Sequence, residues 1–98
     1  MIARIWHGIT PIEKSDAYLE FLQGRAVPDY KLIPGNRGVY ILREHRGEQA
    51  HFLTLTFWDS LEAVRQFAGE DISRAKYYPE DQDFLLEFEP TVVHYEVY

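Results

Sequence analysis

The side chains that could perform chemistry in this sequence are few, and the first of them is His7. It lies among Ile5, Trp6 and Ile9 near the start of the chain. An imidazole titrates near neutral pH, so in apolar surroundings it could bind a phenol oxygen or act as a general base. A hydrogen-bonded histidine in the core would fit the same pattern. His7 is therefore the candidate base.

Aromatic residues and one arginine could bind a small molecule. Trp58 could stack on an aromatic ligand, although a Trp at a strand end is also common core packing. Tyr77 and Tyr78 precede Pro79 and could present phenol groups at the mouth of a pocket, or pin a loop onto the core. Arg37 could orient an acidic or quinonoid oxygen, and its structural alternative is an ordinary ion pair.

The motifs of several other chemistries are missing. The chain has no cysteine, and no two histidines have His-x-x-x-His spacing, so we expect no structural metal site. No segment resembles a phosphate-binding glycine loop, a nicotinamide or flavin fingerprint, or a Gly-x-Ser-x-Gly elbow, and we expect no cofactor. The formal net charge of -6 would repel nucleic acid and anionic membrane surfaces.

Length and composition indicate one globular domain over residues 1–98. Hydrophobic residues make up 46% of the chain and aromatic residues 15%, which is enough apolar surface to require a core, an interface or a pocket. The N-terminus lacks the basic and apolar regions of a signal peptide, and no segment is apolar enough to span a membrane. The expected location is the cytoplasm.

The first half of the chain predicts a strand followed by a helix. Residues 2–9 alternate two side-chain sets, as a strand buried on both faces does. Residues 10–13, Thr-Pro-Ile-Glu, are typical of a capping box and predict a helix that begins at Thr10 and runs to about Gln23. Gly24 is its expected stop.

A β-hairpin and a second helix are predicted next. A further helical turn in residues 25–31 ends at the turn residues 34–36. Residues 39–43 and 50–58 are rich in β-branched and aromatic side chains and should pair antiparallel. Either Asp59 or Ser60 would cap the helix that follows, with Asp59 and Glu62 forming a capping box, an apolar face that includes Phe67, and Gly69 as the stop.

The C-terminal third is predicted to contain one more helical turn and extended segments. Residues 71–77 could form the turn, and residues 84–88 and 92–98 are expected to be extended, with Pro90 between them. The order is then β-α-β-β-α-β, an α+β fold of the ferredoxin-like kind with a four-stranded antiparallel sheet.

Both faces of the predicted strands are apolar, which favours a homodimer. Val39 and Ile41 oppose Tyr40 and Leu42 along one strand. The helices of this topology cover only one face of the sheet, so the other face would expose large side chains. A second copy, packed face to face across a twofold axis, would cover it.

Several stretches resemble the antibiotic biosynthesis monooxygenase family. They are residues 34–38 entering the second strand, residues 53–63 with the passage Trp-x-Ser-x-Glu-Ala, and residues 77–80 and 94–97. The resemblance covers essentially the whole chain. It implies a dimeric α/β barrel with a pocket between sheet and helices in each protomer.

Two chemistries of that family can be compared with this sequence. Members that oxidise polyketide quinols without metal or flavin share Trp58, but their Asn four residues earlier is Thr54 here, whose hydroxyl could donate a hydrogen bond. Haem-degrading members carry an Asn, a Trp and a His at positions that hold His7, Phe67 and Tyr77. All three positions depart from the haem-degrading pattern. The catalytic candidates are then His7, Trp58 and Tyr77, and the candidates for substrate binding are Arg37, Thr54, Phe67 and Tyr78.

Hypotheses of different classes follow. The first is cofactor-independent oxygenation of an electron-rich aromatic or quinol, in which the substrate itself reduces dioxygen and the protein deprotonates, orients and desolvates it. The second is a ligand-binding or stress-related dimer without turnover. An isomerase or cyclase on the same scaffold is a third, and haem degradation is the least favoured.

Overall fold

A four-stranded antiparallel sheet forms the centre of the molecule. The computed structural model describes all 98 residues. The strands are β1 (Ile2–Pro11), β2 (Asn36–Arg46), β3 (Gln49–Trp58) and β4 (Val93–Glu96), and they lie in the order β2-β3-β1-β4. This topology confirms the α+β, ferredoxin-like fold predicted from the sequence.

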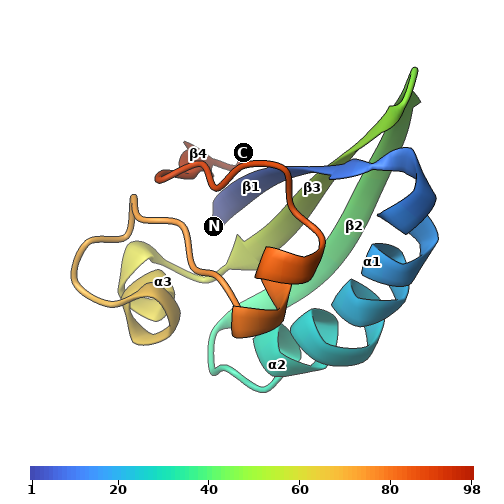
Figure 1. Ribbon diagram of the computed structural model, residues 1–98. Helices are drawn as coiled ribbons and strands as arrows, with labels where there is room; N and C mark the ends of the chain where they lie inside the picture. Colours follow the sequence, from blue (N-terminus) through green and yellow to red (C-terminus); the bar gives the residue numbers. More distant parts are fainter.

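All helical segments lie on one side of the sheet. Figure 1 shows the orange turn η3 between the helical run that contains α1 and α2 and the separate helix α3. The segments are η1 (Ile12–Lys14), α1 (Ser15–Phe21), η2 (Leu22–Ala26), α2 (Val27–Lys31), α3 (Leu61–Ala68) and η3 (Pro79–Asp83). The opposite side of the sheet has no cover.

Strand register determines which side chains face the helices. In β3, the buried residues alternate with half-buried ones: Ala50, Phe52, Thr54, Thr56 and Trp58 point toward the helices. Trp6 pairs with Thr54 and therefore lies on the same side. His7 pairs with Leu53 and faces the other way. Adjacent residues of β1 thus lie on opposite faces of the sheet, one covered by helices and the other uncovered.

The predicted capping box at Thr10 is wrong, because the strand continues through that position. Thr10 pairs with Ala50, and the amide of Ile12 donates to the Glu48 carbonyl at 2.8 Å, which extends the ladder past Pro11. The Thr10 hydroxyl is buried and caps nothing. A β-branched residue fits this pleated, buried setting well.

The predicted stop at Gly24 is also wrong. Helical backbone continues from Ile12 to Lys31, with a π turn at η2 in which the Val27 amide bonds to the Leu22 carbonyl. Pro28 follows this turn and has no N–H to donate to the preceding turn, and a widened π turn is one way for a helix to accommodate such a break. The two predicted helical pieces therefore form one continuous run.

The second helix begins and ends as predicted, with one difference at its cap. Ser60 is the N-cap, since its hydroxyl oxygen accepts a hydrogen bond from the Ala63 amide at 3.2 Å. Glu62 does not complete a capping box and pairs with Arg65 instead. Gly69, with φ of +88°, follows the last residue of α3.

The C-terminal third is less regular than predicted. Residues 71–77 form no helix, and residues 84–88 form no strand. The Leu86 amide donates to the Ile9 carbonyl at 2.9 Å, a single backbone bond to the edge of β1. Backbone pairing resumes at Pro90: Thr91 forms an isolated antiparallel bridge with Arg74, and β4 then pairs with β1.

We expect Gly35→Ala to cost much more stability than Gly47→Ala. Gly35 has φ of +90°, and a Cβ there would lie 2.6 Å from the Ala63 Cβ in α3. Strain and overpacking together should lower the free energy of unfolding by about 2–5 kcal/mol. Gly47, with φ of +58°, has no neighbour within 4 Å and should cost about 1 kcal/mol. Denaturant unfolding of both variants would measure this, and equal losses would contradict the packing argument.

Candidate functional site

A cavity opens on the helix side of the sheet between α2, α3 and the loop after Gly69. It has a volume of about 210 Å³. Its walls are mostly apolar and aromatic, and they consist of Asp29, Tyr30, Ile33, Phe67, Lys76, Tyr77 and Tyr78. We refer to it as the aromatic cavity. A few polar groups among aromatic walls are typical of small-molecule sites.

A small recess shares the Tyr30, Lys76 and Tyr78 walls of the aromatic cavity. Its free volume is about 10 Å³, close to the minimum that one water-sized atom occupies. The other walls come from the sheet, the first helical run and the η3 turn, and they are Trp6, Tyr18, Leu22, Ala26, Thr54 and Asp81. The recess therefore combines a narrow space with several polar groups.

Trp6 contributes one wall of this recess. The residue is only 7% exposed, and its indole Nε1 has no hydrogen-bond partner. Gly8, two residues along the same face of β1, leaves space for the indole: a Cβ at that position would lie 2.3 Å from a ring carbon of Trp6. The absence of a side chain at Gly8 therefore makes room for the Trp6 ring.

The loop that carries Lys76, Tyr77 and Tyr78 is held against the sheet by Arg4. This buried guanidinium donates to the carbonyls of Ile72 at 2.6 Å and Arg74 at 3.1 Å. Burial lowers the pKa of Arg4. The arginine thereby satisfies backbone groups that would otherwise be buried without partners.

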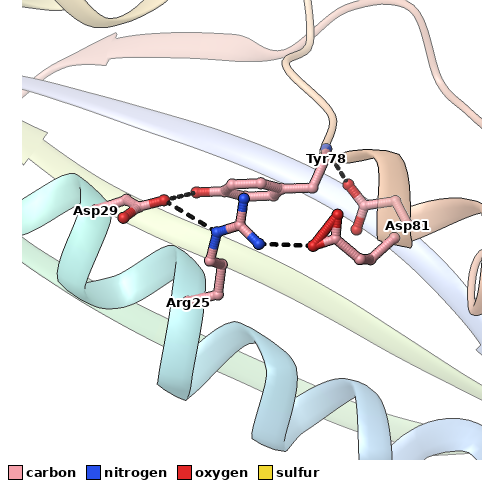
Figure 2. Close-up of polar contacts among 5 residues, drawn as sticks. Arg25, Asp29, Tyr78 and Asp81 are labelled. Atoms are coloured by element: carbon pink, nitrogen blue, oxygen red, sulfur yellow. Dashed lines mark hydrogen bonds and ion pairs between the residues drawn. The ribbon is translucent and has the colours of Figure 1, made fainter.

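Tyr78 closes one wall of the aromatic cavity and is fixed by polar contacts. Figure 2 shows its hydroxyl bonded to Asp29 and its ring beside the guanidinium of Arg25. The hydroxyl donates to the Asp29 carboxylate at 2.8 Å, and the Arg25 Cζ lies 4.8 Å from the ring centroid. Arg25 also binds Glu80 at 2.6 Å. These contacts attach the loop to the helical run.

Asp81 is the buried carboxylate of the recess. One oxygen accepts from the Tyr18 hydroxyl at 3.0 Å, and the other accepts from the Tyr78 amide at 2.6 Å. Burial raises the pKa of Asp81, and the two hydrogen bonds oppose that rise. A carboxyl group with a raised pKa on the wall of a cavity is a candidate proton acceptor.

Lys76 is the cation shared by the aromatic cavity and the recess. Its ammonium donates to the Phe67 carbonyl at 2.9 Å and lies 4.6 Å from the Phe67 ring centroid. It forms no ion pair with a carboxylate, so its positive charge is available to a ligand. Nearby, burial raises the pKa of Tyr30 and of Tyr77. These phenols are therefore neutral hydrogen-bonding groups at pH 7.

The structure brings together some of the site residues predicted from sequence. Phe67, Tyr77 and Tyr78 line the aromatic cavity, and Thr54 lines the recess. The Tyr77 hydroxyl donates to the Glu89 carbonyl at 2.5 Å. Trp58 lines neither space: it is fully buried and stacks on Phe67 at 5.6 Å. It supports the cavity wall from behind.

Arg37 and His7 lie elsewhere. Arg37 is mostly exposed and donates to Asp59 at 2.5 Å, which is the ion pair considered as its structural alternative. His7 faces the open side of the sheet, where its Nδ1 lies 2.5 Å from a Glu89 oxygen and its Nε2 lies 3.0 Å from the His51 Nδ1. Because a carboxylate only accepts, His7 donates from Nδ1 to Glu89. Neither residue reaches the aromatic cavity.

Trp6, Lys76 and Asp81 were missed by sequence reasoning. Trp6 had a signal, since it belongs to the same alternating set as Arg4, whose side chain reaches the helix side. Because alternate residues of a strand lie on the same face, Trp6 rather than His7 would have been the candidate once the helix-covered face of β1 was known. Lys76 and Asp81 lie in loops or short turns, where no periodicity marks which side chains turn inward.

Solved structures with the same fold were found, although no protein-family model and no curated protein matched the sequence. The chain has the fold of the antibiotic biosynthesis monooxygenases. A Bacillus cereus protein provisionally named as one of them is 13% identical, with a TM-score of 0.68 over 99% of this chain and 94% of that one. The haem degrader MhuD from Mycobacterium tuberculosis, with two haems in its active site, is 21% identical, with a TM-score of 0.61 over 99% and 95% of the two chains.

A third structure extends the same comparison. It is a substituted form of MhuD with two manganese protoporphyrin IX molecules per active site, 21% identical with a TM-score of 0.61 over 99% of this chain and 94% of that one. The resemblance predicted from the sequence is thus confirmed in fold. Fold alone does not carry an activity from one protein to another. No helix of this chain has the length and apolar character to cross a membrane.

Proposed function

We propose that this protein is a homodimeric, cofactor-independent monooxygenase that acts on an electron-rich aromatic or quinol-type molecule. The observation that carries the proposal is the aromatic cavity, whose walls of Tyr30, Phe67, Tyr77 and Tyr78 surround one cation, Lys76. Aromatic walls favour a flat ligand, and a dry site strengthens every polar interaction inside it. A role in the cytoplasm is consistent with this proposal.

In this mechanism the substrate supplies the electrons and the protein controls its proton. Asp81 accepts the proton of a bound phenol, so the negative charge passes from the carboxylate to the substrate oxygen. Because Lys76 lines the same space, the charge stays compensated during the transfer. Phe67, Tyr77, Tyr78 and Thr54 hold the electron-rich anion, which reduces dioxygen. One oxygen atom adds to a ring carbon, which becomes a quinone carbonyl, and the other leaves as water with the two hydrogens that the substrate loses.

The homodimer is supported by the open face of the sheet. Large apolar side chains there are exposed by about half: Tyr40 58%, Leu42 46%, Val93 52% and Tyr95 55%. Together with Leu53, Leu55 and Phe57 they form one continuous surface across the four strands, which we call the open face. A contiguous apolar surface of this kind marks an interaction site. A second copy is the occupant that we propose.

The alternative is a dimer that binds an aromatic ligand without turnover. The same cavity supports both, since its walls explain binding but not reaction with dioxygen. Residues present in the cavity do not fit a haem. No histidine lines it, and a cavity of about 150 Å³ holds one benzene ring, so 210 Å³ is small for a porphyrin. An isomerase or cyclase needs the same binding and proton transfer, and is distinguished by turnover without dioxygen.

A comparison of turnover with and without oxygen tests the proposal. Purified protein would be incubated with a panel of single-ring and fused-ring quinols, aerobically and anaerobically, with dioxygen uptake and product mass as readouts. We expect product that contains one oxygen atom from dioxygen, formed only in air. Binding without any product would favour the ligand-binding alternative, and product formed without oxygen would favour an isomerase.

Matched variants connect that activity to the aromatic cavity. Phe67→Ala should lower turnover per folded protein by about tenfold or more, because it removes a wall that orients the substrate. His7→Ala should leave turnover per folded protein unchanged, since His7 lies on the other face of the sheet. A loss of about 10²–10⁴-fold in His7→Ala would restore it as the general base. Thermal unfolding of both variants would separate folding defects from catalytic ones.

A further inference from the structure

Arg4 is the only buried cation of the chain, and no carboxylate neutralises it. The residue is 3% exposed. Its guanidinium donates to the carbonyls of Ile72 and Arg74 and lies 3.1 Å from the His94 Nε2. Burial and the charge of Arg4 lower the pKa of His94, so this imidazole is a neutral partner at pH 7. All partners of Arg4 are therefore uncharged, and its positive charge is not cancelled locally.

Lys76 is a second cation without a counter-ion, and it lies on the wall of the aromatic cavity. Its ammonium donates to the Phe67 carbonyl at 2.9 Å, which leaves two of its three N–H donors free. The only acidic wall residue, Asp29, is already engaged: it accepts from the Tyr78 hydroxyl at 2.8 Å and lies 3.7 Å from Arg25. The charge left over at the cavity is therefore positive.

The Phe67 ring has both cations as neighbours. This ring is a wall of the aromatic cavity, and its centroid lies 4.6 Å from the Lys76 Nζ and 5.5 Å from the Arg4 Cζ. Water and salt screen a buried charge such as Arg4 much less than an exposed one. Although the chain has a net charge of -6, two unpaired cations at one wall create a locally positive potential. Such a site attracts an anion.

The shape of the aromatic cavity limits that anion to one ring with a small charged substituent. Its volume of about 210 Å³ exceeds the roughly 150 Å³ that holds one benzene ring. The rings of Tyr30, Phe67 and Tyr78 favour a flat ligand between them. A phenol, with a pKa near about 10, is neutral at pH 7, whereas a carboxylic acid, with a pKa near about 4, is ionised. A carboxylate on a single ring therefore matches both the volume and the charge.

We infer that the aromatic cavity selects single-ring aromatic carboxylates, whose carboxylate is bound by the Lys76 ammonium and whose ring lies against Phe67. Lys76 is then a specificity-determining residue, and its bond to the Phe67 carbonyl holds the ammonium in place before the ligand arrives. The inference rests on the proposed function, because it names the substrate class of the same cavity, a phenol that also carries a carboxylate. The two cations, Lys76 and Arg4, would offset two negative charges, that of the carboxylate and that of the phenolate formed in the reaction.

A pair of matched probes tests the inference by isothermal titration calorimetry. The probes are 4-hydroxybenzoate and 4-hydroxybenzamide, which share the ring and the hydroxyl and differ in charge. We expect 4-hydroxybenzoate to bind about 5–20-fold more tightly at pH 7 and low salt. Because Lys76 is exposed, this preference should shrink at about 1 M salt, where the Debye length is about 3 Å. In ¹H–¹⁵N spectra both probes should move the amide signals of Phe67 and Tyr77 and leave that of Leu53, on the open face, in place.

Substitutions at two lysines assign the preference to one side chain. Lys76→Met should reduce it to about threefold or less and preserve the affinity for 4-hydroxybenzamide, whereas Lys76→Arg keeps the charge and should retain it. Lys14→Met is the matched control, because Lys14 is also exposed and donates to a backbone carbonyl, that of Asp83 at 2.6 Å, but lines no cavity. It should change neither affinity. The salt dependence of the wild type carries the test even if Lys76→Met does not fold.

The outcomes separate this inference from the proposed function. If the two probes bind the wild type equally well, if the cavity signals stay fixed at saturation, or if Lys76→Met keeps the full preference, the inference is overturned. If neither probe binds although a quinol is oxidised, the inference alone is overturned and the proposed function stands. If 4-hydroxybenzoate binds with the expected preference and no aromatic compound is oxidised in air, the ligand class is correct and the proposed function fails in favour of a binding protein.

Discussion

Leu55→Glu should convert the protein from a dimer to a monomer. Leu55 lies in β3 between Tyr40 of β2 and Ile5 of β1, near the middle of the open face. In a dimer packed through that face, the new carboxylate would be buried without a partner, and two copies would oppose each other across the twofold axis. A buried unpaired charge costs several kcal/mol, so the dimer dissociation constant should rise by about 10³-fold or more.

The monomeric variant should remain folded. Leu55 is half-buried in the isolated chain, on a face where solvent reaches the neighbouring side chains. Leu32→Glu is the matched control, because it makes the same change at a leucine that is 81% exposed beside the helices. Light scattering behind a sizing column should give the dimer mass for Leu32→Glu and 11.6 kDa for Leu55→Glu. Circular dichroism would confirm that both retain their structure.

A wild-type protein that elutes as a monomer at micromolar concentration would remove the dimer from the proposal. A Leu55→Glu variant that stays dimeric would instead place the contact on another surface. In neither case is the aromatic cavity affected, because all of its walls lie on the helix side of one protomer. Turnover measured on the monomeric variant would then show whether the cavity works alone.

The order of elements could be predicted because each has its own local signal. Alternation of side chains predicted β1, and β-branched and aromatic composition predicted β2 and β3. Ser60 and Gly69 flank α3 as expected. The errors occurred where two local signals competed. At Thr10, the capping pattern lost to pairing with Ala50 across the sheet. Such pairing depends on a residue 40 positions away (50 − 10), and no local pattern contains it.

The site was harder to predict than the fold because it depends on which face of the sheet the helices cover. Alternation in β1 separated Trp6 from His7 but did not indicate which set would face the helices. Imidazole chemistry then favoured His7, although Trp6 faces the recess. Phe67 and Thr54 were included through the resemblance, and Tyr77 and Tyr78 also through their place in a loop before Pro79. Three of them line the aromatic cavity, and Thr54 lines the recess.

Asp81→Ala should produce the largest loss of stability among single substitutions at the site. It leaves the Tyr18 hydroxyl, which is almost completely buried, and the Tyr78 amide without their acceptor. Each unpaired buried donor costs about 1–3 kcal/mol, and the Tyr78 amide is nearer to solvent. We expect a total of about 2–4 kcal/mol, which lowers the midpoint of thermal unfolding by about 10–25 °C in a domain of this size.

The loss in Asp81→Ala should also depend on pH in a defined direction. Burial holds the pKa of Asp81 above its unfolded value, so the folded state binds this proton more tightly than the unfolded state. The stability that Asp81 contributes is therefore greatest below the unfolded pKa, about 4, and declines as the pH rises through the folded pKa. The difference in unfolding free energy between wild type and Asp81→Ala should accordingly shrink from acid toward neutral pH.

Two controls make this result specific to the buried carboxylate. Asp83→Ala changes an exposed aspartate in the same η3 turn and should alter stability by no more than about 0.5 kcal/mol. In a Tyr18→Phe background the hydroxyl is already absent, so Asp81→Ala should cost about 1 kcal/mol less than in the wild type, the coupling expected for one buried hydrogen bond. If the losses of unfolding free energy from the two substitutions were fully additive, the Tyr18 hydroxyl would have another hydrogen-bond acceptor, and its bond to Asp81 would not stabilise the fold.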